Sequence, residues 1–177
     1  MIDIGMLSSR YTVRYLDGSD TEDILNLCRG NPRFYRYTEA RPEREQIQND
    51  MRLTPPGIEP SAKHYVGFFR ERDLVAVMDL IDGYPEPGTA YIGFFMMNPL
   101  YQGQGNGSAI IGEAADHLRE TGKTAIRLAI DDGNPQSFGF WKKNGFSVIA
   151  EADANGWKKL IAERSLRNGK GRTDHGV

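Results

Sequence analysis

The stretch Gln102-Gly103-Gln104-Gly105-Asn106-Gly107 decides how this chain folds and what it can bind. It separates an apolar run at residues 91–97 from a helix-like run that begins near Ser108. Alternating glycines let the backbone come close to a ligand, and successive N–H groups that lead into a helix N-terminus favour an anion such as a diphosphate. Two common nucleotide motifs fit poorly. No Lys-Ser or Lys-Thr pair follows the glycines, and residues 98–101 intervene between the strand and the loop, unlike the dinucleotide fingerprint.

The periodicity of apolar residues predicts alternating strands and helices along the chain. We expect a strand at 11–16, a helix from Ser19 or Asp20 to about Arg29, and a second helix that starts after Pro42. A hairpin, a strand and a helix should follow, at 64–69 with 74–81, at 90–97 and at about 105–121. The remaining expected elements are a strand at 124–130, a helix at 136–144 and strands at 146–151 and 158–163, the last two joined by a tight Asn155-Gly156 turn. Residues 166–177 are polar and glycine-rich, which is typical of a loose tail.

Length and composition indicate one globular domain of 177 residues, and we expect its core at about 11–165. A net charge of −2 gives no reason to expect binding to nucleic acid or to an anionic membrane, and no apolar run is long enough to span a bilayer. The N-terminus lacks the pattern of an export signal, and a single cysteine, Cys28, suits a reducing cytoplasm. His64, His117 and His175 are too scattered to predict a metal site.

Two blocks of sequence together resemble the GNAT acetyltransferase superfamily. The first is Gln102-x-x-Gly105-x-Gly107 after an apolar strand, which resembles the acyl-CoA diphosphate loop of that family. The second runs from Asn134 through Trp141 to Gly145-Phe146 and is similar to the late helix of the family and its closing Gly-Phe. The resemblance covers residues 11–165. It implies a mixed α/β (α+β) fold, in which a mostly antiparallel sheet of about six to seven strands is flanked by about four helices, and acetyl-CoA as cosubstrate without a metal.

The resemblance also implies which residues contact the cofactor. Phe95 would present a backbone N–H, freed by a strand bulge, to the thioester carbonyl. The implied cofactor-binding residues are Phe95, Met96, Met97, Gln102, Gly103, Gln104, Gly105, Asn106, Gly107, Ser108, Asn134, Ser137, Phe140 and Trp141.

Structural interpretations stand beside these functional ones. The glycine stretch can be an ordinary turn, and the apolar strand residues can be core while their backbone does chemistry. Asn134 followed by Pro135 is a typical helix cap, and Phe140 and Trp141 can be an apolar helix face. Lys142 and Lys143 can approach the 3′-phosphate of coenzyme A, although a solvated helix face is the favoured interpretation.

The sequence departs from the family pattern at the proton-transfer groups. Trp141 stands where many relatives carry a tyrosine that reprotonates the leaving thiolate. Tyr91 stands where others carry a glutamate or histidine base, and Gly93 on the same face leaves room for an acceptor. Asp79 and Asp82 are the remaining candidates for a base. For Asp79, a solvent-facing or hairpin-capping position is the favoured alternative.

We therefore expect direct acetyl transfer from acetyl-CoA to a primary amine of a small molecule or peptide. The alternative is a catalytically weak module of the same fold that binds acyl-CoA, and a weaker possibility is acylation of a hydroxyl or of a protein N-terminus. Five acids, Asp79, Asp82, Glu86, Asp131 and Asp132, suggest a cationic acceptor. The acceptor pocket should form from residues 20–53 and the loop 83–88. Relatives are often dimers, so a homodimer is possible.

Overall fold

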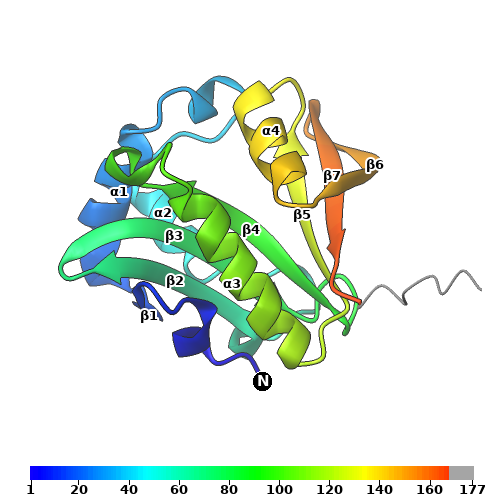
Figure 1. Cartoon of the computed structure of the whole chain (residues 1–177). Coiled ribbons are helices and arrows are strands. Elements are labelled where there is room, and N and C mark those ends of the chain that lie inside the picture. The colour runs from blue at the N-terminus through cyan, green and yellow to red at the C-terminus, as the bar shows by residue number, and fades with distance from the viewer. Residues whose placement is uncertain (168–177) are drawn as a thin grey trace, which may run out of the picture.

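The computed structural model describes residues 1–167, which form one seven-stranded sheet with helices on both faces (Figure 1). The elements follow the expected order, and the predicted mixed α/β fold is confirmed. Their bounds are β1 Thr12–Tyr15, α1 Thr21–Arg29, α2 Arg44–Asp50, β2 Lys63–Arg70, β3 Asp73–Asp82, β4 Thr89–Met97, α3 Asn106–Glu120, β5 Ala125–Asp131, α4 Pro135–Lys143, β6 Ser147–Ala154 and β7 Trp157–Ser165.

The strands lie in the order β1-β2-β3-β4-β5-β7-β6. All neighbouring pairs are antiparallel except β4 and β5, which are parallel and are connected through α3. Two parallel neighbours need such a crossover, because a tight turn reverses the direction of the chain and can join only antiparallel strands. The β6–β7 hairpin turns at Asn155 and Gly156, which both have positive φ (54° and 81°), as that turn type requires.

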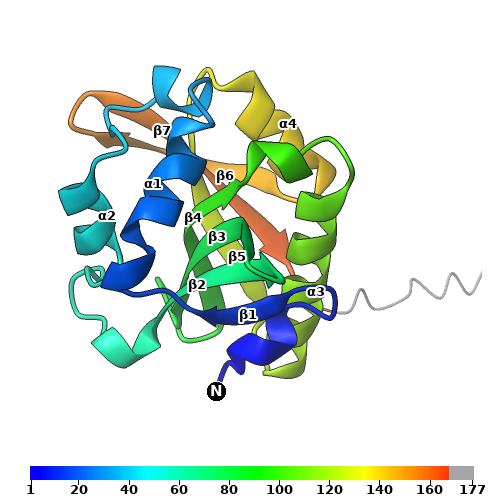
Figure 2. The same cartoon turned by 90° about the vertical axis from the view of Figure 1, so that its left-hand side faces the viewer.

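Helices on the two faces of the sheet bury two separate apolar cores. The helix α3 covers one face, where Phe68, Met78 and Ile111 are fully buried. The helices α1 and α2 cover the other face, where Leu25 and Val77 are fully buried (Figures 1 and 2). Residues alternate between the two cores along the central strands, because successive side chains of a strand point to opposite faces.

The packed structure extends beyond the expected core of residues 11–165 at both ends. Ile2 and Leu7 are buried within the α3 core, and Glu113 of α3 accepts hydrogen bonds from Ser8 and Ser9. Leu166 is buried, and its N–H donates to the Thr124 carbonyl, so the loose tail does not begin at residue 166. Residues 168–177 of that expected tail lie outside the described residues.

A bulge in β4 separates this strand from β5. Asp79 on β3 pairs with Phe94 and the next residue, Leu80, pairs with Ile92, so Gly93 has no partner on β3. The parallel pairing of β4 with β5 also stops at Ile92. A bulge bends its strand and increases its twist. Beyond Gly93 the two central strands therefore diverge, and their facing edges are not joined to each other.

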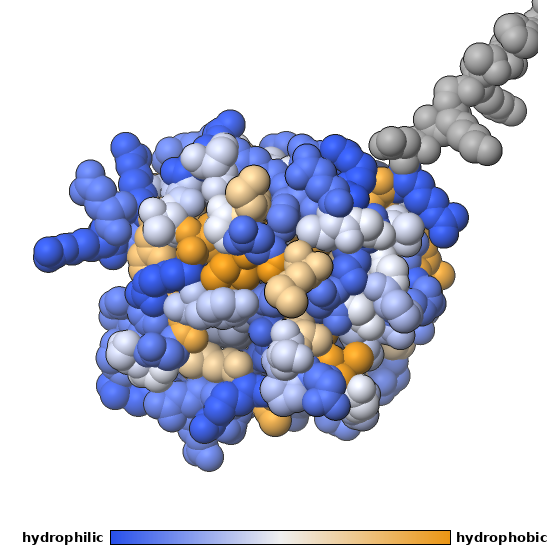
Figure 3. All heavy atoms as spheres, turned by 90° about the horizontal axis from the view of Figure 1, so that it is seen from below, coloured by the Kyte–Doolittle hydropathy of each residue, from blue (hydrophilic) through white to orange (hydrophobic). Residues whose placement is uncertain are grey.

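The end of the molecule seen in Figure 3 is mostly hydrophilic, with small separate apolar areas. Among residues 1–167, no helix has the length and apolar character that crossing a bilayer requires.

Gly67 of β2 generates a prediction about core packing. A Cβ at this position would lie 2.7–2.8 Å from side-chain atoms of Phe69, Leu16 and Leu74, which are all buried. We expect Gly67→Ala to lower the free energy of unfolding by about 1–3 kcal/mol through overpacking. The matched control is Gly112→Ala in α3, where a Cβ meets nothing within 4 Å, and it should raise stability by about 0.5–1 kcal/mol. Urea unfolding measures both, and equal stability of Gly67→Ala and the natural protein would contradict the prediction.

Candidate active site

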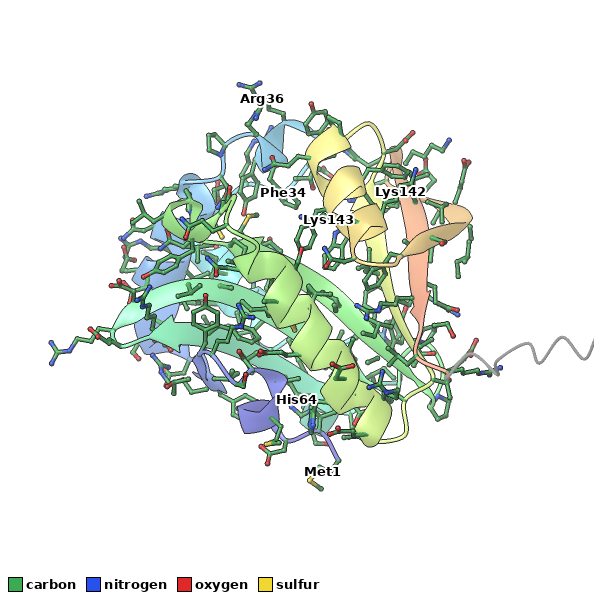
Figure 4. The ribbon with its side chains drawn as sticks, viewed as in Figure 1. Met1, Phe34, Arg36, His64, Lys142 and Lys143 are labelled. Atoms are coloured by element: carbon green, nitrogen blue, oxygen red, sulfur yellow. The ribbon has the colours of Figure 1, made fainter. Side chains whose placement is uncertain are left out.

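A cavity of about 890 Å³ occupies the space where β4 and β5 diverge. Its walls come from β4, β5, α4, the glycine loop, and the segment from α1 to α2. Phe34 and Lys143, which line it from opposite sides, lie at the upper end of the molecule in Figure 4, whereas His64 and Met1 lie at the lower end. The cavity contacts thirteen of the fourteen residues that the sequence assigns to cofactor binding, and Gln104 is the exception.

The glycine loop presents a run of unpaired backbone donors to this cavity. Gly103 and Gly105 have φ of 73° and 79°, a conformation that glycine adopts without steric cost. Within the described chain, the N–H groups of residues 103–108 have no hydrogen-bond acceptor, and the first paired N–H is that of Ala109. Three of these N–H groups form the N-terminus of α3. Six neighbouring donors at the positive end of a helix dipole favour a multiply charged anion.

The side chain of Gln102 faces inward and joins the loop to the sheet. Its Nε2 donates to Asn31 Oδ1 (2.6 Å) and to the Met97 carbonyl (3.0 Å). Asn31 Nδ2 donates to the same carbonyl at 2.9 Å. Gln102 therefore caps the C-terminal end of β4, and its side-chain amide already donates to acceptors within the protein. Gln104 donates to the Leu100 carbonyl and does not line the cavity.

The backbone N–H of Phe95 points into the gap between the diverging strands. Asn98 donates its N–H to the Val75 carbonyl of β3 at 2.8 Å. Because N–H groups alternate between the two sides of an antiparallel strand, the N–H of Phe95, three residues earlier, points away from β3. On that side the described residues provide no strand partner after Ile92. This geometry leaves the Phe95 N–H available to an oxygen atom in the cavity.

Aromatic side chains form the wall between the glycine loop and α4. The ring of Phe140 stacks on that of Phe95 at 5.9 Å and meets Trp141 edge-on at 4.9 Å. A Cβ on Gly107 would lie 3.1 Å from Phe140, so the start of α3 packs closely against this wall. Trp141 is 7% exposed and belongs to the α3 core. Both interpretations from sequence therefore hold, because these aromatic side chains pack in or against the core and also line the cavity.

Asn134 caps α4 and also faces the cavity. Its Oδ1 accepts the N–H of Ser137 at 3.1 Å, which is the cap that the sequence pattern predicts. Its Nδ2 has no acceptor among the described residues, although the side chain is almost fully buried. One donor thus remains for a ligand that passes along α4.

Asp79 is buried beneath the bulge, which contradicts the solvent-facing or hairpin-capping position favoured from sequence. Both of its carboxylate oxygens accept from Lys63 Nζ at 2.8 Å. Its Oδ2 lies 2.8 Å from the position that a Cβ on Gly93 would take, and Gly93 lines the cavity. Burial raises the pKa of Asp79 above its ordinary value, while the Lys63 ammonium opposes this rise. A carboxylate with a raised pKa next to a cavity suits a general base.

Tyr91 does not reach the cavity. It lies two residues before the bulge, where β4 still pairs with β5, and its ring packs edge-on against Tyr84 at 5.2 Å. Burial raises the pKa of this phenol, which makes its anion harder to form. The loop 83–88, expected to form part of the acceptor pocket, also contributes no lining residue.

The five acids expected to attract a cationic acceptor do not gather at the cavity. Asp82 pairs with Lys123, and Asp132 lies within salt-bridge distance of Lys158. Asp131 lines the cavity, where it pairs with Lys159. Together with Asp79, four of the five thus have a lysine partner. Between residues 1 and 167, no group of three or more His, Cys, Asp or Glu side chains could hold a metal ion.

Residues 20–53, which were expected to form part of the acceptor pocket, line the far end of the cavity, but sequence reasoning assigned no individual residue to it. The lining residues at this end come from α1, the following loop, α2 and β2, and they are Cys28, Phe34, Tyr35, Asp50 and Tyr65. Lys63, the partner of Asp79, was also missed. A lysine on one strand and an aspartate on the next are a weak signal of an ion pair. The pair can be predicted only when the register of β2 on β3 is known.

The chain matches the Acetyltransferase (GNAT) family over residues 22–146, well over half of its length. A curated relative, the spermine/spermidine N(1)-acetyltransferase of Bacillus subtilis, is 32% identical over 109 residues. That match covers 56% of this chain and 72% of the relative.

Solved structures show the same fold at low sequence identity. A PaiA N-acetyltransferase from Thermoplasma acidophilum, in complex with coenzyme A, has a TM-score of 0.64 and 20% identity, and the match covers 86% of this chain and 97% of that one. A spermidine N-acetyltransferase chimera from Vibrio cholerae and hSSAT has a TM-score of 0.66 and 18% identity, and the match covers 89% of this chain and 96% of that one. With its split central sheet, its loop of unpaired amides and these matches, the chain belongs to the GNAT family of acetyltransferases.

Proposed function

We propose that the protein transfers an acetyl group from acetyl-CoA directly to a primary amine of a small acceptor. The observation that carries this proposal is one cavity lined both by the glycine loop, with its unpaired N–H groups, and by Phe95, with its free N–H. The first set suits a diphosphate, and the second suits a thioester carbonyl oxygen. The relatives that act on spermine and spermidine support an amine as acceptor.

The residues of the chain divide the reaction between them. Acetyl-CoA supplies an activated acetyl group. The amine nitrogen forms the new C–N bond as the C–S bond breaks, and coenzyme A leaves as a thiolate that takes up a proton to become the free thiol. The Phe95 N–H stabilises negative charge that develops on the carbonyl oxygen. The aromatic wall of Phe95, Phe140 and Trp141 keeps water away from the cofactor arm, and Asn134 Nδ2 can bind its amide oxygens.

The acceptor must lose a proton before or during attack. An alkyl ammonium with an ordinary pKa costs about 4 to 5 kcal/mol to deprotonate at neutral pH. Asp79 is the acid next to the bulge, and its raised pKa makes it a better base than an exposed aspartate. We infer that Asp79 accepts this proton past Gly93, which has no side chain to block the path.

The assay that tests the proposed function mixes the protein, acetyl-CoA and a panel of amines and follows the release of free thiol. Amine-dependent thiol release, with one acetylated product per thiol, is the expected result. Tight binding of acetyl-CoA without amine-dependent release would instead identify a module that only binds acyl-CoA. Failure to bind the cofactor at millimolar concentration would refute both.

Ser108→Glu tests the anion site at the start of α3. Ser108 lines the cavity at the third helical position, where a carboxylate repels a diphosphate but favours the helix by about 0.3–1 kcal/mol. We expect the Kd of coenzyme A, measured by calorimetry, to rise about tenfold or more, because one nearby like charge costs at least about 1.4 kcal/mol at this range. Gly112→Glu adds the same charge to the same helix away from the cavity and should leave Kd nearly unchanged. Equal effects of the two variants would argue against a diphosphate at the loop.

Lys63→Met tests the role of Asp79 through the pH profile. Activity that needs ionised Asp79 is lost as pH falls through the pKa of that group. Removing the Lys63 ammonium takes away a charge that lowers this pKa, so the pKa rises further. The acid limb of the plot of kcat/KM against pH should therefore move to higher pH. Lys158→Met, on the surface, should leave the limb in place, and an unmoved limb in folded Lys63→Met would exclude Asp79 as the base.

A further inference from the structure

One carboxylate in the cavity wall lacks a cationic partner. Asp50 and Asp131 are the acids that line the cavity, and Asp131 pairs with Lys159. Asp50, at the end of α2, accepts one hydrogen bond at Oδ1, from Gln46 Nε2 at 2.7 Å. Among residues 1–167, no basic side chain lies within salt-bridge distance of Asp50, and no donor reaches its Oδ2. A half-buried carboxylate with an unpaired oxygen costs free energy unless a cation or a water molecule binds to that oxygen.

The nearest lysine does not supply that cation. Lys63 is close enough to lower the pKa of Asp50, yet burial dominates and holds that pKa above its ordinary value. Both carboxylate oxygens of Asp79 receive the Lys63 ammonium, whose side chain is 4% exposed. Two ionised carboxylates and one ammonium leave this group with one negative charge. Arg41, at the rim, directs Nη1 to the carbonyls of Tyr35, Thr38 and Ala40.

Aromatic rings surround the same end of the cavity. Phe34 meets Tyr35 edge-on at 5.1 Å and Phe94 at 6.3 Å, and Tyr65 also lines the wall. Burial raises the pKa of Tyr35 and of Tyr65, so both phenols stay neutral and keep their hydroxyl groups. Aromatic faces attract ammonium groups, and the attraction grows when the group is partly removed from water. The apolar rings also suit the methylene chain of an alkyl amine.

We propose that Asp50 and the surrounding aromatic rings bind a second, charged ammonium group of the acceptor, so that the preferred acceptors are linear alkyl diamines and polyamines. This inference rests on the proposed function. One amine loses its proton near Asp79 and attacks the thioester, while the distal ammonium keeps its proton and pairs with Asp50 Oδ2. After this proton transfer the acceptor keeps one positive charge, and the carboxylate of Asp50 pairs with it.

The test compares putrescine with butylamine, which have equal carbon chains and differ by one ammonium group. For the natural protein, we expect a kcat/KM for putrescine about tenfold or more above that for butylamine, since a hydrogen bond to a charged group contributes about 1.5–3 kcal/mol. Asp50→Asn should lower kcat/KM for putrescine by a similar factor, mainly through KM. It should leave butylamine within about twofold.

The matched control is Glu45→Gln, which makes the same charge change on an exposed residue of the same helix and should alter neither amine. Thermal melting and the Kd of coenzyme A check that Asp50→Asn is folded. The comparison of the two amines on the natural protein needs no variant. Equal kcat/KM for both amines would overturn the inference and leave the proposed function intact, as would equal losses for both amines in folded Asp50→Asn. Turnover of neither amine, nor of any other in the panel, would instead refute the proposed function.

Discussion

The site depends on the failure of β4 and β5 to remain paired beyond Ile92. Backbone N–H and C=O groups are costly to leave without partners when they are buried. The protein satisfies the Met97 carbonyl with the side-chain amides of Asn31 and Gln102 and leaves the Phe95 N–H facing the cavity. The bulge at Gly93 thus does two things: it opens the space between the strands, and it provides a polar group there for a ligand.

Charge is distributed unevenly along this opening. The glycine loop and the start of α3 offer the unpaired N–H groups of residues 103–108, whereas the end between α1, α2 and the sheet holds Asp50 and the Asp79–Lys63 pair. A buried ion pair costs desolvation energy that its attraction does not always recover. Asp79 and Lys63 lie directly behind Gly93, which is the position where the acceptor would lose its proton under the proposed function.

Much of the fold was predictable from sequence, and part of the site was not. The spacing of apolar residues and the residues typical of turns predicted the order of strands and helices, because each element carries its own pattern of apolar residues. The direction of a polar side chain depends on partners far along the chain. Gln102 bonds to Asn31, seventy-one residues away, and Asp79 meets Lys63 only through the register of β2 on β3. Asp50 carries no motif at all, and its position became clear only when α2 was placed over the sheet.

The parallel seam between β4 and β5 contains only four residue pairs, from Thr89 with Ala125 to Ile92 with Leu128. The glycine loop follows β4 and α4 follows β5, so a molecule held by both would link the two parts of the sheet where the backbone does not. Such a ligand acts as a removable cross-link. At a hundred times its Kd it would add about 2.7 kcal/mol to the free energy of unfolding. The fraction of protein with ligand bound would therefore determine how often the chain opens around the cavity. It would also determine how well the chain resists proteolysis.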